Sequence, residues 1–251
     1  MLLPPLAMGK KGKKAQAGKP KKLTPKDVGK RLNVLAKNLE EELEGADLFA
    51  PFPPTEDCAI CLVPLSPVNS GTYYQACCGK DICKACYKEN RESVNKQNEE
   101  KNAGKKIAFT CPFCREPEAT CFDEGYARLQ ARCLQKDHIA FTQLGGIYRK
   151  GEGGTGKDDL KALDYYIRAV ELGSPEACTF IAGYYDEGNG VAADEERAAL
   201  FYRIGALRGS VIARHNIGFY EYKNLGNHEI GIRHWKIILP PRLATKSPSI
   251  H

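Results

Sequence analysis

Residues 58–61 read CAIC, residues 77–86 read CCGKDICKAC and residues 111–115 read CPFCR. These three stretches hold eight of the eleven cysteines of the chain. Each contains two cysteines separated by two residues, a spacing that puts a pair of thiolates on one tight turn at the separation a tetrahedral Zn²⁺ site requires. One such pair also occurs in redox motifs or by chance, whereas three pairs in succession are strong evidence of a metal-binding module. The sequence therefore predicts a zinc-stabilised module.

A disulfide framework is the alternative for a cysteine-rich segment. Secreted frameworks follow a signal peptide, but in MLLPPLAMGKKGKK the apolar run is short, contains Pro4 and Pro5, and precedes the basic residues. No stretch approaches the roughly 18 consecutive apolar residues that cross a bilayer. We therefore expect a cytoplasmic or nuclear protein without a membrane partner. Cys121, Cys133 and Cys178 lie outside the spacing pattern and are expected to be ordinary thiols.

The order of the cysteines resembles that of the RING-type zinc finger, a family that binds two zinc ions in a cross-braced arrangement. The matching pattern is C-x-x-C, then C-G-x-x-x-C-x-x-C, then C-P-F-C-R. The resemblance implies a small α+β module over residues 55–118, whose folding is coupled to metal binding because so short a segment builds little core. It also implies two sets of ligands: Cys58, Cys61, Cys83 and Cys86 for one ion, and Cys78, Cys111, Cys114 and one further residue for the other.

The last ligand of the second ion is where this sequence departs from the family. The family usually has Cys-Gly-His at this point, whereas residues 78–80 read CGK, and a Lys ammonium cannot bind zinc. The five histidines begin at His138, so none lies in the module. Cys77 is the nearest spare thiol, and we predict that Cys77 and Cys78 both bind the second ion. Cys121, or a weakly metallated site with three ligands, is the alternative.

The resemblance also implies an activity, that of a ubiquitin-protein ligase or ligase subunit. In such ligases, apolar residues at the positions of Ile60 and Pro112 contact a ubiquitin-conjugating enzyme. A cation at the position of Arg115 holds the ubiquitin thioester in a reactive pose. This is catalysis by positioning, since the nucleophile and the thioester belong to the partners, and we expect no catalytic nucleophile in this chain. The polar loop 87–110, expected to begin with a short helix, offers few further apolar contacts: Tyr87, Ile107 and Phe109.

The N-terminal part of the chain carries the positive charge. Residues 1–31 contain ten Lys and Arg against one acid, whereas the whole chain has a formal net charge of +6. We expect residues 1–23 to form a disordered Lys-rich tail. A nuclear-import signal or a non-specific anion-binding arm is a sharper interpretation of the same residues. Sequence-specific nucleic-acid recognition is not expected, because the tail has no aromatic side chain to stack on bases.

An amphipathic helix is predicted over residues 24–45. Thr24 is a good N-cap, Pro25 suits the first helical position, and Gly45 is placed to end the helix. Apolar residues recur along it at steps of three and four, at Val28, Leu32, Leu35, Leu39 and Leu43. We expect this stripe to pack against the zinc module or against a repeat domain; self-association as a coiled coil is the alternative, less favoured over so few turns.

Residues 127–238 carry an internal repeat, in which Ala140, Ala177 and Ala213 align at periods of 37 and 36 residues. The pattern A-x-x-x-L-G-x-x-Y-x-x-G, followed by K-A-x-x-Y-Y-x-x-A, resembles the Sel-one-like repeat, a relative of the tetratricopeptide repeat. The resemblance implies pairs of antiparallel helices stacked into a solenoid. Two full units and a degenerate third are recognisable. Residues 151–157 (GEGGTGK) match the G-x-x-x-x-G-K of a phosphate-binding loop, but the next residue is Asp158 where such a loop has Ser or Thr. We therefore expect an inter-helix turn here.

The expected architecture is thus a small cross-braced zinc-binding α+β module plus an all-α helical-repeat solenoid, with a disordered basic N-terminal tail and an irregular C-terminal tail over 239–251. The function it predicts is a RING-type ubiquitin ligase with two zinc ions that recruits a protein substrate or adaptor through its repeats. A non-enzymatic, zinc-stabilised adaptor for protein–protein interaction is the alternative. A nucleic-acid-associated zinc protein is a third class, supported by the tail alone.

Overall fold

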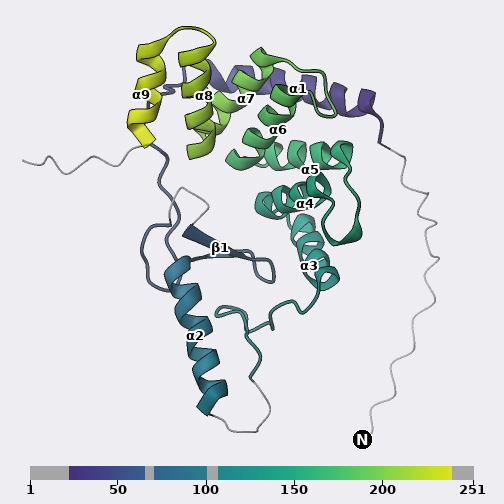
Figure 1. Ribbon diagram of the computed structural model, residues 1–251, viewed down its shortest axis with the longest axis vertical. Helices are drawn as coiled ribbons and strands as arrows, with labels where there is room; N and C mark the ends of the chain where they lie inside the picture. The colour runs from purple at the N-terminus through teal and green to yellow at the C-terminus, as the bar shows by residue number, and fades with distance from the viewer. Residues whose placement is uncertain (1–22, 66–70, 101–106, 239–251) are drawn as a thin grey trace, which may run out of the picture.

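The structure is a computed structural model and describes residues 23–65, 71–100 and 107–238 (Figure 1). The expected tails at 1–23 and 239–251 lie outside these residues, except for Leu23, which packs against the core of the helices. The N-terminal half contains α1 (Pro25–Leu43), β1 (Thr72–Gln75), β2 (Lys80–Cys83) and α2 (Lys84–Glu100). The C-terminal half is helical: α3 (Phe122–Leu134), α4 (His138–Lys150), η2 (Glu152–Gly154), α5 (Asp159–Glu171), α6 (Pro175–Glu187), α7 (Glu195–Leu207), α8 (Val211–Lys223) and α9 (His228–Ile238). None of the helices described is both long and apolar enough to span a bilayer.

The repeat array consists of the helix pairs α4–α5, α6–α7 and α8–α9. The first helix of each pair begins after Asp137, Ser174 or Ser210, and each of these side chains accepts a hydrogen bond from a backbone N–H of the first turn. Such caps satisfy N–H groups that have no partner within the helix, and each contributes about 1 kcal/mol. The repeated cap is therefore the local reason why each unit starts where it does.

Small residues allow the paired helices to approach closely. A Cβ atom added at Gly145 of α4 would lie 2.5 Å from the ring of Tyr166 on α5, so no larger residue fits there. Residues 151–157 are the turn between α4 and α5 that the sequence predicts, with Gly151 in the left-handed conformation at φ 71°. Gly188 ends α6 in the same way, at φ 68°.

Helix α1 packs against the second helices of the first two pairs, α5 and α7. Its buried residues belong to the same core as α5, α6 and α7: Val28, Leu32, Leu35, Ala36 and Leu39. Ion pairs from Arg31 to Asp164 and from Arg208 to Glu42 flank this apolar contact. The partner of the amphipathic stripe is therefore the repeat array, and Figure 1 shows α1 lying across it.

The connector after α1 is fastened to the last repeat. Arg214 of α8 is buried; it donates to the carbonyl of Leu48 (2.7 Å) and stacks over the ring of Phe52 (4.6 Å). Burial lowers the pKa of this guanidinium. Phe49 packs on His234 of α9, with ring centroids 4.7 Å apart. These contacts fix the path along which the chain reaches the cysteine-rich module, residues 55–118.

The module contains the antiparallel β1–β2 hairpin, in which Tyr73 pairs with Ile82, and the helix α2. The helix expected at the start of the 87–110 loop is present, but it is longer than expected, since α2 has 17 residues and begins at Lys84. The C-terminal end of α2 is held by Asn98, whose side chain accepts from the N–H of Ile107 (2.6 Å) and donates to the carbonyl of the same residue (3.0 Å).

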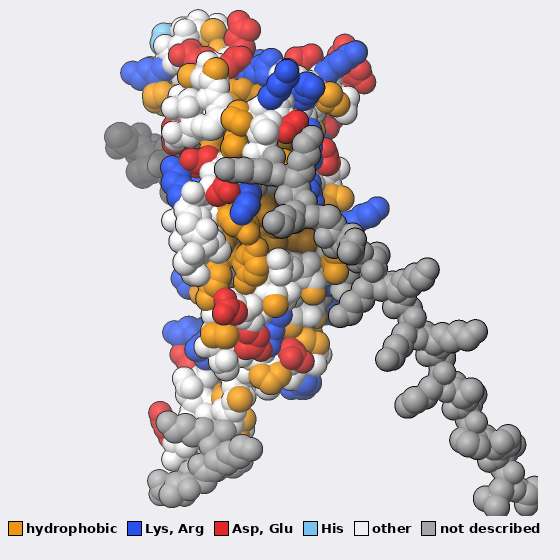
Figure 2. All heavy atoms as spheres, turned by 90° about the vertical axis from the view of Figure 1, so that its right-hand side faces the viewer, with side chains coloured by type: hydrophobic (Ala, Val, Ile, Leu, Met, Phe, Trp, Pro, Cys, Tyr) orange, Lys and Arg blue, Asp and Glu red, His pale blue; other side chains and the backbone are white. Residues whose placement is uncertain are grey.

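On the face shown in Figure 2, basic and acidic side chains are interspersed, in keeping with a positive charge concentrated in the tail.

Candidate metal centre

Eight cysteines of the module converge in two groups. Cys58, Cys61, Cys83 and Cys86 form the first cluster, and Cys77, Cys78, Cys111 and Cys114 form the second. Within each cluster the Sγ atoms all lie within 4.8 Å of one another. A tetrahedral Zn²⁺ with Zn–S bonds of about 2.3 Å has S···S edges of about 3.8 Å. The Cys61–Cys83 pair (3.8 Å) and the Cys78–Cys111 pair (3.7 Å) match that edge, so both clusters could hold a metal ion.

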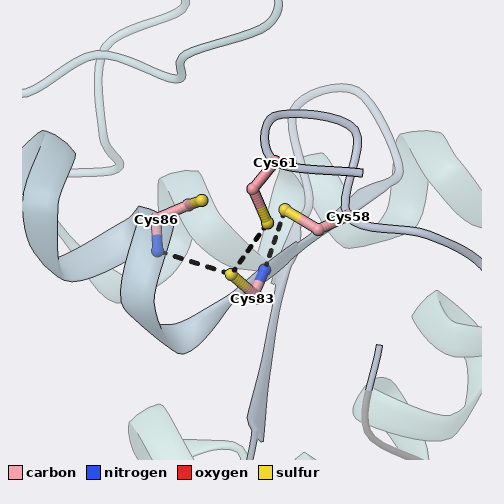
Figure 3. Close-up of side chains that lie close together, drawn as sticks. All are labelled: Cys58, Cys61, Cys83 and Cys86. Carbon is pink, nitrogen blue, oxygen red and sulfur yellow. Dashed lines mark hydrogen bonds between the residues drawn. The ribbon is translucent and has the colours of Figure 1, made fainter. Parts of the chain in front are cut away.

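Three different elements supply the first cluster (Figure 3). Cys58 and Cys61 come from the loop before β1, Cys83 ends β2, and Cys86 lies in the first turn of α2. The four side chains point toward one another, and the backbone N–H of Cys83 donates to the Sγ of Cys58 (3.5 Å). A small core formed by the module surrounds them: Leu65, Ile82, Tyr87 and Phe113.

The two C-x-x-C loops at 58–61 and 111–114 share one backbone geometry. The residue after the second cysteine, Leu62 or Arg115, has a positive φ (58° and 62°). Its N–H donates to the carbonyl of the first cysteine of the loop, at 2.8 Å for Leu62 and 3.0 Å for Arg115. Isolated β-bridges close both loops, Asp57–Pro64 and Thr110–Pro117. Left-handed backbone at a residue other than Gly is unfavourable, and it persists where the surrounding structure imposes it, as at a ligand-holding turn.

The electrostatics of the thiols differ within each cluster. Burial opposes ionisation of Cys58, but N–H groups of Cys83, Cys61 and Ile60 point at its sulfur and lower its pKa to about 6. Burial is likewise outweighed by backbone N–H groups at Cys111, whose pKa is lowered. Burial and the neighbouring thiols raise the pKa of Cys77. At Cys58 in one cluster and Cys111 in the other, the backbone therefore favours the thiolate, which is the form that binds a metal ion.

Cys77 lies in the second cluster and Cys121 does not. Cys77 and Cys78 occupy the turn between β1 and β2, which Gly79 closes at φ 75°. Cys121 is exposed and directly precedes α3. Lys80 places its ammonium over the ring of Phe113, 5.1 Å from the centroid. Lys80, which stands where the RING family usually has a histidine, therefore lies over Phe113, a residue that packs against the core of the module.

The residues expected to contact a partner lie at the surface. Ile60 is 45% exposed, and the adjoining Leu62 and Val63 are 74% and 56% exposed, so the first C-x-x-C loop presents three apolar side chains to solvent. Arg115 is exposed and Pro112 is half-buried. Tyr87 and Phe109, in contrast, pack on each other, and Tyr87 also stacks on Tyr73 at 4.1 Å.

Sequence reasoning missed the residues that join the module to the helices. The hydroxyl of Tyr74 on β1 donates to Asp137 (2.6 Å), and Arg132 of α3 donates to the same carboxylate (2.7 Å). Asp137 was identifiable as a helix N-cap ahead of the apolar run from Ile139, but its two long-range partners carry no sequence signal.

The molecule is thus a helical-repeat protein with a cysteine-rich module. Its repeats match the family model for the Sel1 repeat at residues 142–174 and 175–210, so this part of the chain consists of Sel1 repeats. Repeats stacked in this way form scaffolds for protein–protein interaction. A third pair, α8–α9, continues the array beyond the matched residues.

Two solved structures resemble the chain. A Sel1 repeat protein from Oxalobacter formigenes is 28% identical, with a TM-score of 0.44, over 47% of this chain and 49% of that one. A protective antigen of uropathogenic Escherichia coli displaying an SLR fold is 27% identical, with a TM-score of 0.43, over 48% of this chain and 26% of that one. The chain therefore spans about half of the first protein and about a quarter of the second. No curated protein matches the chain.

Proposed function

We propose that the protein is a RING-type ubiquitin-protein ligase or ligase subunit. One observation carries the proposal. The cysteine pairs alternate between the clusters along the chain: the 58/61 and 83/86 pairs form the first cluster, and the 77/78 and 111/114 pairs form the second. Each cluster thus encloses part of the other in sequence. This interleaving is what a cross-braced pair of metal sites requires, and it supports the resemblance of the cysteine order to the RING family.

The metal in this proposal is zinc, with two ions per chain. Soft thiolate ligands in a four-fold, tetrahedral set are typical of structural zinc sites, whereas catalytic sites keep one position open for water or substrate. All four positions of each cluster are provided by cysteines of the chain. The ions would supply folding energy to the module and would take no part in chemistry.

The chain would act by holding its partners in place. The exposed apolar loop with Ile60, Leu62 and Val63 is suited to a hydrophobic contact with a ubiquitin-conjugating enzyme. Arg115, exposed at the turn of the last C-x-x-C loop, is available to restrain the enzyme-bound ubiquitin. Pre-organising the reactants in this way removes the entropic cost of their encounter from the reaction barrier.

The Sel1 repeats would recruit the protein substrate or an adaptor. Such repeats present an extended surface built from successive helices, and binding to it requires no motif in the chain beyond the array. Free thiolates and thiol-bound zinc are compatible with the cytoplasm or nucleus, where we place the protein.

The second candidate is a non-enzymatic adaptor in which the module is purely structural. Two observations favour it: Lys80 stands in the family's histidine position and covers Phe113, and Tyr87 and Phe109 pack within an aromatic cluster. Ile60 and Arg115 remain exposed and available to the partners of a ligase in spite of both features. We therefore favour the ligase over the adaptor.

An in vitro ubiquitination assay with a panel of conjugating enzymes separates the two. We expect Ile60→Ala and Arg115→Ala each to reduce chain formation at least about tenfold, the loss of one well-placed contact of about 1.4 kcal/mol. Val34→Ala is the matched control, because Val34 is 64% exposed on α1, outside the module. Ubiquitin chains that form regardless of both changes, or that never form across the panel, would assign the protein to the adaptor class.

A further inference from the structure

Helix α3 places two arginines, one helical turn apart, against the two loops of the second cluster. Arg132 lies on the β1–β2 turn: a Cβ atom added at Gly79 would come 1.9 Å from its Nη2 atom. Arg128 donates from Nη1 to the carbonyl of Pro117 (2.7 Å), the residue whose bridge to Thr110 closes the 111–114 loop. Residues at i and i+4 lie on one face of a helix, so α3 spans the cluster from one loop to the other.

Both guanidinium groups are also held on the side of the helices. Arg132 donates to Asp137 through Nε (3.0 Å) and Nη2 (2.7 Å), and the side chains of this pair are 19% and 9% exposed. Arg128 pairs with Glu124 one turn earlier. Partly buried, charge-assisted hydrogen bonds with fixed geometry are stronger than exposed ion pairs. The side chains of both arginines are therefore held in one conformation.

Apolar packing completes the same joint. Tyr74 and Ala76 of the hairpin pack against a core made by α3 and α4, which contains Leu129, Ala140 and Leu144. Figure 1 shows the hairpin directed at these helices. The core around the first cluster, by contrast, is built from the module alone in the part of the chain that the structure describes. The clusters therefore differ among the described residues: Ala76, which directly precedes Cys77 of the second cluster, packs on the helices, whereas the core that contains Cys58 and Cys86 of the first cluster is made of module residues.

We propose that Arg128 and Arg132 are positioning residues of the second cluster, so that α3 completes a metal site whose ligands all lie in the module. Arg132 rests on the β1–β2 turn and Arg128 donates to the carbonyl of Pro117, so the two side chains would hold both ligand loops in the positions that a metal ion requires. Metal binding at the second cluster and docking of the module on α3 then stabilise each other to the same extent. This inference rests on the proposed metal binding and is independent of ligase activity.

Chelator competition on the full, zinc-loaded chain tests it, with cysteine alkylation mapped by mass spectrometry as the readout. The map reports the two clusters separately within one molecule, so the first cluster is an internal control. We expect Arg132→Ala and Arg128→Ala each to lower the affinity of the second cluster about tenfold, the usual size of an outer-shell effect. Cys77, Cys78, Cys111 and Cys114 would then become reactive at lower chelator concentration than in the wild type, while the first cluster is unchanged. Arg168→Ala, on the exposed face of α5, is the matched control.

Arg132→Lys distinguishes charge from fork geometry, and we expect it to recover part of the lost affinity. Equal loss of metal from both clusters in the alanine variants would show general unfolding of the module and would overturn the inference. So would an unchanged second cluster in both variants. A wild-type chain that binds no zinc would overturn the proposed function as well, whereas two firmly bound ions that ignore both arginines would remove this inference alone.

Discussion

Leu32 is the side chain on which the docking of α1 most directly depends. It has no exposed surface and lies in the core that α1 shares with α5 and α7. Replacing it with Ala removes buried carbon atoms and leaves a cavity, because helices held by neighbours on both sides cannot collapse to fill the space. Leu→Ala changes at such sites cost about 3 kcal/mol. We expect Leu32→Ala to destabilise the repeat array by that amount.

For a helical domain of this size, 1 kcal/mol corresponds to a change in melting temperature of roughly 3–5 °C, which gives a decrease of about 10 °C. Thermal unfolding of the metal-loaded chain, followed by circular dichroism and by the fluorescence of Trp235, measures it. Trp235 is the sole tryptophan of the chain and lies in α9, so its signal reports whether the last repeat unfolds together with the first two.

Val34→Ala is the control, because Val34 lies on the same helix but is 64% exposed, and such substitutions usually change stability by less than about 0.5 kcal/mol. If Leu32→Ala and Val34→Ala melted at the same temperature, α1 would contribute nothing to the array, and the account of its apolar stripe would be refuted.

Two further results are expected. Burial and the neighbouring Arg214 lower the pKa of His234 to about 4, so between pH 6.5 and 4 the unfolded chain binds a proton that the folded chain does not. The free energy of unfolding should therefore be highest above pH 6.5 and fall as the pH drops through that range. In urea unfolding, His234→Gln should flatten this pH dependence, whereas His215→Gln, at an exposed position, should leave it unchanged. Equal pH profiles for the two variants would contradict the assignment to His234. Removing metal with a strong chelator should abolish the hydrogen-exchange protection of the β1–β2 hairpin, whereas α5–α7 should stay protected because those helices have their own core. Loss of protection in both regions would contradict this expectation.

Much of the molecule follows from local sequence patterns. The caps at Thr24 and Asp137 are short-range signals, and they mark the starts of α1 and α4 in the structure. The repeat period depends on residues that pack within one helix pair or between adjacent pairs, such as Gly145 against Tyr166. The spacing of the cysteines predicted clusters that could hold metal ions, because three C-x-x-C pairs in succession each put two thiols on one tight turn.

Other features depend on surfaces that meet only in the folded chain. An amphipathic helix shows that it must be covered but not by what, and only the tertiary structure places the stripe of α1 on α5 and α7. Surface-type arginines such as Arg128 and Arg132 look alike in a sequence, whether they face solvent or rest against a ligand loop. The physical reason is range. Caps, turns and periodic packing are decided among residues close in the chain. The joint between the module and the helices, in contrast, includes the contact of Tyr74 with Asp137, which lie 63 positions apart and meet only through the path of the chain between them.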